Sequence, residues 1–236
     1  MTPIQGQLFD FLVKFNQFCQ ENDIQYSLFW GTLLGCVREK GFIAWDDDVD
    51  VIMTRENFEK FKQLAAEQKL PKNFAFEDSL FLKGCRIPKV RDKSVQITDR
   101  NAGEGIFIDI FPMDRYTSWD VKILSLAAKG LKIRDYRKKI ASKTIRSIYT
   151  LLSWVPYSFF VLSRKLYCQK KLEKGSYWGI APVCNAEHFF AEKLLDKTVL
   201  MQFETAQLPI PIGYDEILKL CYGDYMTPVD YGNQHY

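Results

Sequence analysis

The sequence predicts an α+β fold, in which a mixed sheet is flanked by helices. Three observations support this fold class. The chain has 236 residues, of which 47% are hydrophobic and 15% aromatic, so it can bury a substantial core. Segments with the apolar spacing of helices alternate with short segments that have the alternation of strands. A lysine- and arginine-rich helical stretch, about 119–174, interrupts this order. We therefore predict a single domain, residues 1–236, that carries a basic helical insert.

The first part of the chain predicts helices and strands in alternation. Apolar residues recur at helical spacing from Leu8 to Cys19, and a buried strand follows. Thr54 is placed to cap a later helix. The expected elements are a helix over 8–19, a strand over 24–30, a tight turn and short helix over 31–38, a strand over 49–53 and a helix from Thr54.

The later elements are shorter and lie on both sides of the basic stretch. Gly105 to Phe111 predicts a strongly apolar strand, which we expect Pro112 to end because proline has no amide hydrogen for a strand ladder. The other expected elements are strands over 74–76, 85–90 and 94–98, helices over 119–174 with a break at 154–156, an edge hairpin over 200–212 and a helix over 214–222.

Four aspartates lie at the start of the second predicted strand: Asp46, Asp47, Asp48 and Asp50. Because successive side chains of a strand point to opposite faces, Asp46, Asp48 and Asp50 are expected to share one face. Like charges on one face imply a cation between them. Carboxylate oxygens suit Mg²⁺ or Mn²⁺, and the absence of a nearby His or Cys disfavours zinc.

Asp109 is a lone carboxylate within the apolar strand 105–111. If its strand neighbours the second one, Asp109 completes a divalent-metal site with Asp48 and Asp50, and it can accept the proton of an attacking hydroxyl. Phosphoryl-type transfer is the chemistry that most needs this arrangement. The acidic run is also compatible with a solvated turn or a calcium loop, but it lacks the twelve-residue ligand spacing of an EF-hand.

These residues resemble the signature of the LicD family of phosphotransferases, which fukutin-type proteins share. The similarity covers most of the chain in three ordered blocks. They are Tyr26–Val51, which includes Trp30-Gly31-Thr32-Leu33-Leu34-Gly35, then Ile108–Asp114, and then Leu208–Met226.

The resemblance implies a nucleotidyltransferase-like fold and an enzyme that uses a CDP-activated donor such as CDP-choline. Such an enzyme transfers phosphocholine or a related substituted phosphate to a hydroxyl of a cell-surface glycan, and releases CMP. The acceptor is a glycan or lipid-linked glycan of lipopolysaccharide, capsule or teichoic acid. The resemblance also implies that Asp48, Asp50 and Asp109 are the catalytic metal ligands, that Asp46 is an additional ligand, and that Asp47 points away.

The donor phosphates need amides and cations that can approach them closely. Gly31 has no Cβ to obstruct a phosphate, and Thr32 adds a hydroxyl, although the same residues are compatible with a plain tight turn. The candidate cationic partners are Arg38, Arg86, Lys89, Arg91 and Lys93, with Arg91 the first choice. Trp30 and Trp45 are suited either to a quaternary ammonium group or to packing in the core.

Charge is distributed unevenly along the chain, whose net charge is +3. Residues 119–174 contain 14 Lys and Arg against three Asp and Glu, which leaves 18 basic and 26 acidic residues elsewhere. The basic segment is suited either to lying on an anionic membrane surface or to packing on the catalytic part with solvated lysines. No nucleic-acid partner is expected, because no RNA- or DNA-binding motif accompanies these charges.

The cysteines and the first residues indicate a cytoplasmic protein. Six cysteines occur without a C-x-x-C pair, which indicates reduced thiols. The first residues lack the pattern of a secretory signal, so we expect a cytoplasmic location, at most peripheral at the inner face of the membrane. Two other functions stay open: a nucleotidyltransferase that uses a nucleoside triphosphate directly, and a non-catalytic module that binds the membrane surface.

Overall fold

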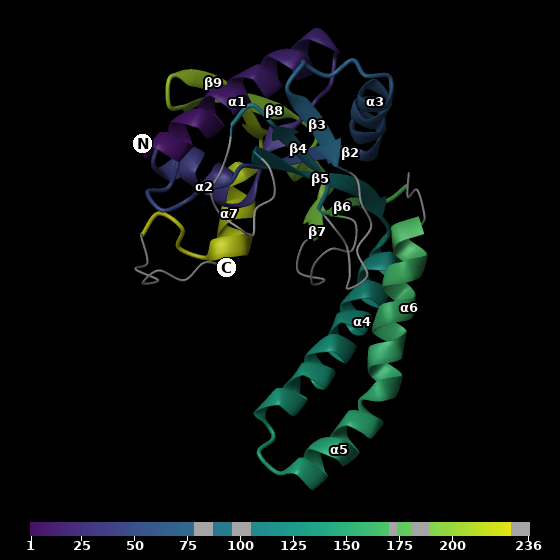
Figure 1. Cartoon of the computed structure of the whole chain (residues 1–236). Coiled ribbons are helices and arrows are strands. Elements are labelled where there is room, and N and C mark those ends of the chain that lie inside the picture. Colours follow the sequence, from purple (N-terminus) through teal and green to yellow (C-terminus); the bar gives the residue numbers. More distant parts are fainter. Residues whose placement is uncertain (78–86, 96–104, 170–173, 181–188, 228–236) are drawn as a thin grey trace. The chain divides into compact units, whose positions relative to one another are not determined.

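A computed structural model describes residues 1–77, 87–95, 105–169, 174–180 and 189–227 (Figure 1). These residues form helices and strands in an α+β arrangement, as the sequence predicts. They divide into two compact units. The first contains the described parts of Met1–Asp78, Pro88–Phe111 and Lys193–Tyr236, and the second contains those of Pro112–Glu192. This division does not test whether the chain folds cooperatively, so the single domain stays a prediction.

The first unit contains a sheet whose strand order is β1-β2-β5-β4-β3. Its strands are β1 (Ser27–Leu28), β2 (Asp50–Thr54), β3 (Phe74–Glu77), β4 (Lys89–Asp92) and the beginning of β5 (Ile106–Tyr116). The pairs β1–β2, β3–β4 and β4–β5 are antiparallel. The central position of β5 brings Asp109 next to strands from both sides.

Two amphipathic helices supply aromatic side chains to the core of this unit. They are α1 (Pro3–Glu21) and α3 (Arg55–Ala66). The ring of Phe11 on α1 lies 4.8 Å from that of Phe74, and the ring of Phe61 on α3 lies 5.5 Å from that of Phe76. The apolar stripe predicted over 8–19 is buried as expected, and Thr54 caps α3 by accepting a hydrogen bond from the Asn57 amide.

The C-terminal part of the first unit packs against its N-terminal part. It consists of the hairpin β8 (Thr198–Phe203) and β9 (Ala206–Pro211), followed by α7 (Tyr214–Tyr222). The hydroxyl of Ser27 donates to the carbonyl of Pro209 at 3.4 Å. In α2 (Trp30–Arg38), Arg38 donates to the carbonyl of Tyr225 at 3.2 Å. The predicted hairpin and final helix are confirmed, although the hairpin forms a two-stranded sheet of its own and not an edge of the larger sheet. The first and third sequence blocks lie together.

Several predicted strands have different limits. The strand expected over 24–30 is reduced to β1, because Trp30 already begins α2 with a positive φ of 45°. At the predicted strand 94–98, Ser94 instead forms a turn in which its amide donates to the Asp92 carboxylate at 2.9 Å, and 96–98 lie outside the described residues. The strand expected over 85–90 begins only at Lys89, and residues 85 and 86 also lie outside the described part.

The expectation that Pro112 ends its strand is wrong. Strand β5 continues through Pro112 to Tyr116. Its pairing with β4 covers Ile106 to Asp109, and its pairing with β6 begins at Met113. Pro112 lies between these two ladders, where its missing amide hydrogen removes no paired hydrogen bond.

The second unit contains the end of β5, a helical hairpin and two short strands. The helices are α4 (Ser118–Tyr136), α5 (Lys143–Leu152) and α6 (Trp154–Gln169), and the strands are β6 (Tyr177–Ile180) and β7 (Phe189–Ala191). Helices α4 and α6 lie side by side, with α5 at the end of this hairpin (Figure 1). The helical character of this segment is confirmed from Ser118 to Gln169, and residues 170–173 lie outside the described part. The break expected at 154–156 is wrong, because Pro156 fits within the first turn of α6. The chain instead leaves the α-helix over 137–142 and at Ser153. The sequence did not predict β6 and β7.

Among the described residues, no single helix is long and apolar enough to cross a membrane. The bent pair Lys143–Leu152 and Trp154–Ser163 reaches the required length and composition only when its two helices are taken together.

We expect Gly35→Ala to destabilise the first unit. A Cβ on Gly35 would lie 2.5 Å from the carbonyl oxygen of Gly41 and 3.2 Å from the amide nitrogen of Ile43, and neither backbone group can move away cheaply. We predict a loss of about 1–3 kcal/mol in the free energy of unfolding, measured by urea denaturation.

Gly6→Ala is the matched control for this substitution. Gly6 also lies within a helix, and a Cβ there meets nothing within 4 Å. Alanine at that position should raise the free energy of unfolding by about 0.5–1 kcal/mol. Equal effects of the two substitutions would contradict the close contact at Gly35.

Candidate active site

The site is built on the polar face of the sheet in the first unit. Residues Ile106, Ile108 and Ile110 of β5 are buried in the core, so Asp109 faces the opposite side of the sheet. The amide of Asp109 donates to the carbonyl of Val49 at 2.8 Å, and β2 is the neighbour of β5 in the sheet. The predicted proximity of the two acidic segments is therefore confirmed.

The aspartates before β2 come together without the predicted strand geometry. Strand β2 begins only at Asp50, so strand alternation does not place Asp46 and Asp48 on its face, and that part of the prediction is wrong. The chain instead turns at this point, where the amide of Asp46 donates to the carbonyl of Ile43 at 3.0 Å. The side chain of Asp47 is exposed, which agrees with the expectation that it points away.

Burial, and after it the charges of neighbouring carboxylates, raises the pKa values of these carboxyl groups. Burial raises the pKa of Asp46 to about 7, with further contributions from the charge of Asp48 and a hydrogen bond to it. Burial also raises the pKa of Asp48. The pKa of Asp50 is raised well above its usual range by burial and by the charges of Asp48, Asp109 and Asp46. These four carboxylates therefore form one electrostatic group, which we call the aspartate group.

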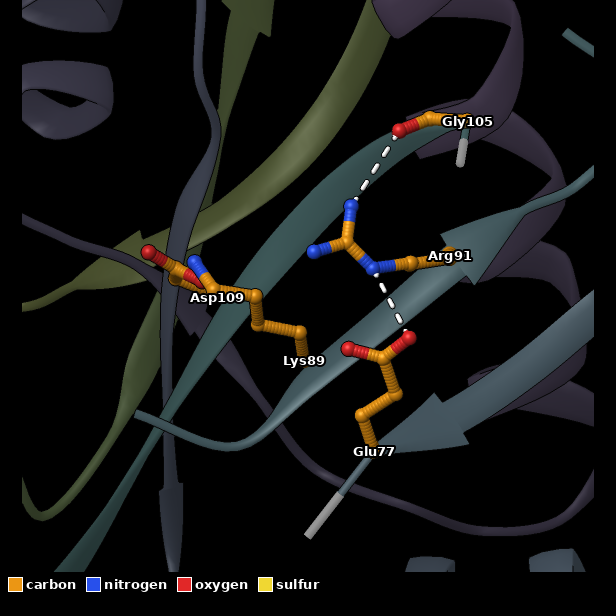
Figure 2. Close-up of polar contacts among 5 residues, drawn as sticks. All are labelled: Glu77, Lys89, Arg91, Gly105 and Asp109. Carbon is orange, nitrogen blue, oxygen red and sulfur yellow. Dashed lines mark hydrogen bonds and ion pairs between the residues drawn. The ribbon is translucent and has the colours of Figure 1, made fainter. Parts of the chain in front are cut away.

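A basic side chain partly offsets this repulsion. Burial raises the pKa of Asp109 to about 6, although the ammonium of Lys89 lowers it. Lys89 lies directly across from Asp109 on β4, and the two side chains form an ion pair (Figure 2). The ammonium of Lys89 also lies 3.8 Å from the ring centroid of Phe107. Lys89 thus places a positive charge beside the aspartate group.

Arg91 lies two residues further along β4 and is fixed from two sides. Its guanidinium forms an ion pair with Glu77 at 3.0 Å and donates to the carbonyl of Gly105 at 3.2 Å (Figure 2). It is 8% exposed. Two anchors hold the planar group in one orientation, which suits recognition of a phosphate or carboxylate. The role of Arg91 in substrate binding stays a prediction.

Helix α2 begins beside the aspartate group. A Cβ on Gly31 would lie 3.1 Å from Oδ2 of Asp46, so glycine permits this close approach. The hydroxyl of Thr32 accepts a hydrogen bond from the amide of Asp50 at 2.9 Å, which connects the first turn of α2 to the start of β2. The preceding Trp30 has a left-handed φ of 45°, a conformation that concentrates at functional sites when a non-glycine residue adopts it.

Of the remaining predicted substrate residues, Arg38 lies at the C-terminal end of α2, the opposite end from Gly31 and Thr32. Arg38 forms an ion pair with Glu39 at 2.7 Å and lines a pocket together with Trp45. Trp45 is 60% exposed, so packing in the core is ruled out for it. Lys93 is exposed in the turn after β4. Arg86 lies outside the described residues.

The structure adds two residues that the sequence analysis did not single out. Gln5 is 2% exposed, and its side-chain amide donates to the carbonyls of Ile43 and Asp46, both at 2.9 Å. It therefore fixes the turn that carries the aspartates. Tyr222, at the end of α7, is 42% exposed. The pKa of its hydroxyl is raised by partial burial and by the charges of Cys221, Asp50, Asp46 and Asp48, so it lies within electrostatic range of the aspartate group.

Only part of this pattern could have been seen in the sequence. The Thr2-x-x-Gln5 spacing is that of a capping box, which forms at the start of α1, but local spacing does not predict the contacts of Gln5 with residues 43 and 46. Tyr222 belongs to the third block that resembles the LicD family. Its proximity to aspartates more than 170 positions earlier is a tertiary contact.

The aspartate group has the chemistry of a divalent-cation site. Its donors are carboxylate oxygens, and Oδ2 of Asp46 is buried without a hydrogen-bond partner. A hard cation such as Mg²⁺ or Mn²⁺ suits such donors and would offset their repulsion. Asp109 forms its ion pair with Lys89. Among the described residues, no three His, Cys, Asp or Glu side chains lie close enough together to hold a metal ion. Metal binding therefore stays a prediction.

Comparison with known protein families identifies the family to which this chain belongs. Residues 23–142, a span of 120 of the 236 residues, match the family described as LicD/FKTN/FKRP, nucleotidyltransferase domain. The chain belongs to the LicD family. The match contains Gly31 and Thr32, the aspartate group, Lys89 and Arg91, and so covers the site described above.

Two relatives of this LicD-family chain extend the comparison. It is 27% identical over 228 residues to the lipopolysaccharide cholinephosphotransferase LicD of Haemophilus influenzae, a match that covers 90% of this chain and 86% of that protein. It is 26% identical over 125 residues to an uncharacterized protein of Rickettsia typhi, which covers 49% of this chain and 40% of that protein. The first relative extends the similarity beyond residue 142, to most of the chain.

We expect stability to fall with rising pH when divalent cations are removed. The pKa of Asp46 is about 7 in the folded chain, against about 3.9 for an unfolded aspartate. The folded state therefore holds the proton more tightly. The contribution of this proton to the free energy of unfolding is fully present below about pH 4 and is lost as the pH rises through about 7.

Asp46→Asn tests this dependence by urea unfolding in EDTA. The variant should lose less stability than the natural chain between pH 4 and 8, and should be more stable by roughly 1–2 kcal/mol at pH 8. Asp47→Asn, at the exposed neighbouring position, is the control and should change the pH profile less. Parallel profiles for the natural chain and Asp46→Asn would contradict the repulsion within the aspartate group.

Proposed function

We propose that this LicD-family protein is a metal-dependent phosphotransferase. It transfers phosphocholine, or a related substituted phosphate, from a CDP-activated donor such as CDP-choline to a hydroxyl of a cell-surface glycan. CMP is the second product. The acceptor belongs to lipopolysaccharide, capsule or teichoic acid. Similarity to the lipopolysaccharide cholinephosphotransferase LicD along 90% of the chain supports phosphotransfer to lipopolysaccharide.

The observation that carries this proposal is the meeting of the aspartate group with the N-terminus of α2. Asp48, Asp50 and Asp109 would hold Mg²⁺ or Mn²⁺, with Asp46 as an additional ligand. When bound, the metal would neutralise charge on the phosphate oxygens during transfer. The first turn of α2 has no side-chain cap and no acidic residue, so its amides suit an anion. Donor phosphates and carboxylates would thus meet at Gly31 and Thr32.

Asp109 is suited to act as the base in the transfer. It is a carboxylate on the sheet face that carries the other aspartates, so it can accept the proton of a hydroxyl bound there. The acceptor hydroxyl oxygen forms a bond to the phosphorus of the donor, and the bond from that phosphorus to the bridging oxygen of CMP breaks. The hydroxyl proton passes to Asp109, and CMP leaves with the electron pair of the broken bond. The charge of Lys89 would limit the pKa of Asp109 in this step.

Basic and aromatic side chains of the first unit are candidates for the rest of the donor. Arg91 is held rigidly by Glu77 and Gly105, and Arg38 lies on the pocket that Trp45 also lines. We assign Arg38, Lys89 and Arg91 to the donor phosphates. The exposed indole of Trp45 is available to a quaternary ammonium group by cation–π attraction.

A second candidate function is direct nucleotidyl transfer from a nucleoside triphosphate. The description of the matched family as a nucleotidyltransferase domain favours it. The third possibility, a non-catalytic module, is disfavoured because clustered carboxylates with raised pKa values cost stability and give a binding module no benefit. We place the phosphotransferase activity in the cytoplasm, at the inner face of the membrane, where a lipid-linked acceptor would be accessible.

We predict that Asp48→Asn abolishes transfer and leaves the fold intact. The substitution removes a proposed metal ligand, but it also removes one of several charges that repel each other. Release of CMP from CDP-choline should fall by about a hundredfold or more. Asp47→Asn changes the adjacent, exposed aspartate in the same way and should keep most of the activity. Unfolding of Asp48→Asn, or full activity in it, would contradict the assignment.

The donor is identified by thermal shift with a panel of nucleotides. CDP-choline, CDP-ethanolamine, CDP-glycerol, CDP-ribitol and CTP are compared with and without Mg²⁺ or Mn²⁺. A ligand that binds only the folded state raises the melting temperature. We expect a metal-dependent rise with one CDP conjugate. A rise with CTP alone would favour the nucleotidyltransferase, and no rise with any nucleotide would contradict both enzymatic functions.

A further inference from the structure

Helix α5 of the second unit exposes its apolar side instead of burying it. Ile145, Ile148 and Leu152 are spaced i, i+3 and i+7, so they share one face, which Leu151 widens. These four side chains are 56–77% exposed, and no residue of α5 is buried. The apolar face of an amphipathic helix normally contacts a core. Within the second unit, nothing described covers this face.

The start of α6 continues the same exposed apolar surface. Trp154, Val155 and Leu162 are 61%, 69% and 56% exposed. Helices α5 and α6 follow one another with a single residue, Ser153, between them, at the end of the α4–α6 hairpin (Figure 1). We call the exposed apolar side chains of α5 and of the first nine residues of α6 the α5–α6 face.

Every charged residue between Asp135 and Glu173 in the sequence is basic. The chain contains nine Lys and Arg and no Asp or Glu between Asp135 and Glu173. On α5 itself, Lys143 and Arg146 lie on the side opposite the isoleucines. The guanidinium of Arg146 donates to the carbonyl of Ile140 at 2.6 and 2.9 Å, which fixes the start of the helix. An apolar face with cations and a tryptophan beside it complements an anionic surface with an apolar interior.

We infer that the α5–α6 face docks on the surface of an anionic lipid bilayer. The apolar side chains of α5 and the start of α6 enter the boundary between headgroups and acyl chains. The lysines and arginines contact anionic headgroups. This assigns membrane contact to one particular surface within the basic segment 119–174.

Two other occupants of this face fit the same observations less well. The first alternative is a pair of helices that spans the membrane. The helices Lys143–Leu152 and Trp154–Ser163 are ten residues each and bend by 47°, so together they are shorter end to end than a straight 20-residue helix, which only just spans about 30 Å. Spanning would also place Lys143 and Arg146 at or within the bilayer. A second copy that packs through the same face would bring another basic segment, with no acidic residue between Asp135 and Glu173, against this one. An anionic membrane satisfies both the apolar face and the charges.

Vesicle sedimentation with the purified full chain tests this docking. We expect binding to vesicles of phosphatidylcholine with phosphatidylglycerol, weak binding to phosphatidylcholine alone, and weaker binding at high salt. Ile148→Glu places a charge on the apolar face and should weaken binding by about tenfold or more. Neither donor nor acceptor is present in this assay, so its failure would leave the proposed phosphotransfer untouched.

Ser147→Glu is the matched control, because it adds the same charge at the adjacent exposed position outside the apolar face. It should weaken binding by about fivefold at most. Circular dichroism should show unchanged helix content in both variants. Equal losses in the two variants, or equal binding to both kinds of vesicle, would overturn the proposal. The proposal would also be overturned if the natural chain did not bind vesicles but formed a dimer, and if Ile148→Glu dissociated that dimer.

Discussion

Electrostatic repulsion among Asp46, Asp48, Asp50 and Asp109 is the constraint on which the rest of the site depends. Burial makes each charge more costly, and the charge of Asp48 raises the pKa values of Asp46, Asp50 and Asp109. A fold keeps such a group only if the surrounding structure prevents the carboxylates from separating. Lys89 supplies one compensating charge within the chain. A divalent cation, by our proposal, supplies the rest when the enzyme works.

The surrounding structure fixes the aspartates through contacts between distant segments. Gln5, from the first helix, bonds to the turn before the aspartates, and Thr32 accepts from the amide of Asp50. Arg38 bonds to the segment after α7. These contacts are hydrogen bonds of backbone groups, so they fix positions without neutralising the carboxylates. The first and third blocks of the LicD signature are far apart in sequence, but these contacts bring them together in the fold.

The sequence predicted the elements whose limits depend on local chemistry. Helix α7 has the expected bounds because glycines flank it on both sides, and the stripe from Leu8 to Cys19 is buried as its spacing predicts. The failures occur where tertiary pairing decides. Pro112 is tolerated because β5 changes partners there, and Asp46 reaches the group through a turn and not along a strand. Gln5 could not be predicted as a positioning residue, because its partners lie about forty residues away.

A crystal structure with Mn²⁺ and CDP-choline would test the central claim most directly, because the anomalous signal of manganese locates the metal independently of the protein coordinates. The account predicts a manganese peak about 2.1 Å from carboxylate oxygens of Asp48, Asp50 and Asp109, with the donor phosphates at the first turn of α2. A nucleotide bound elsewhere, or a manganese ion that does not contact these aspartates, would contradict it.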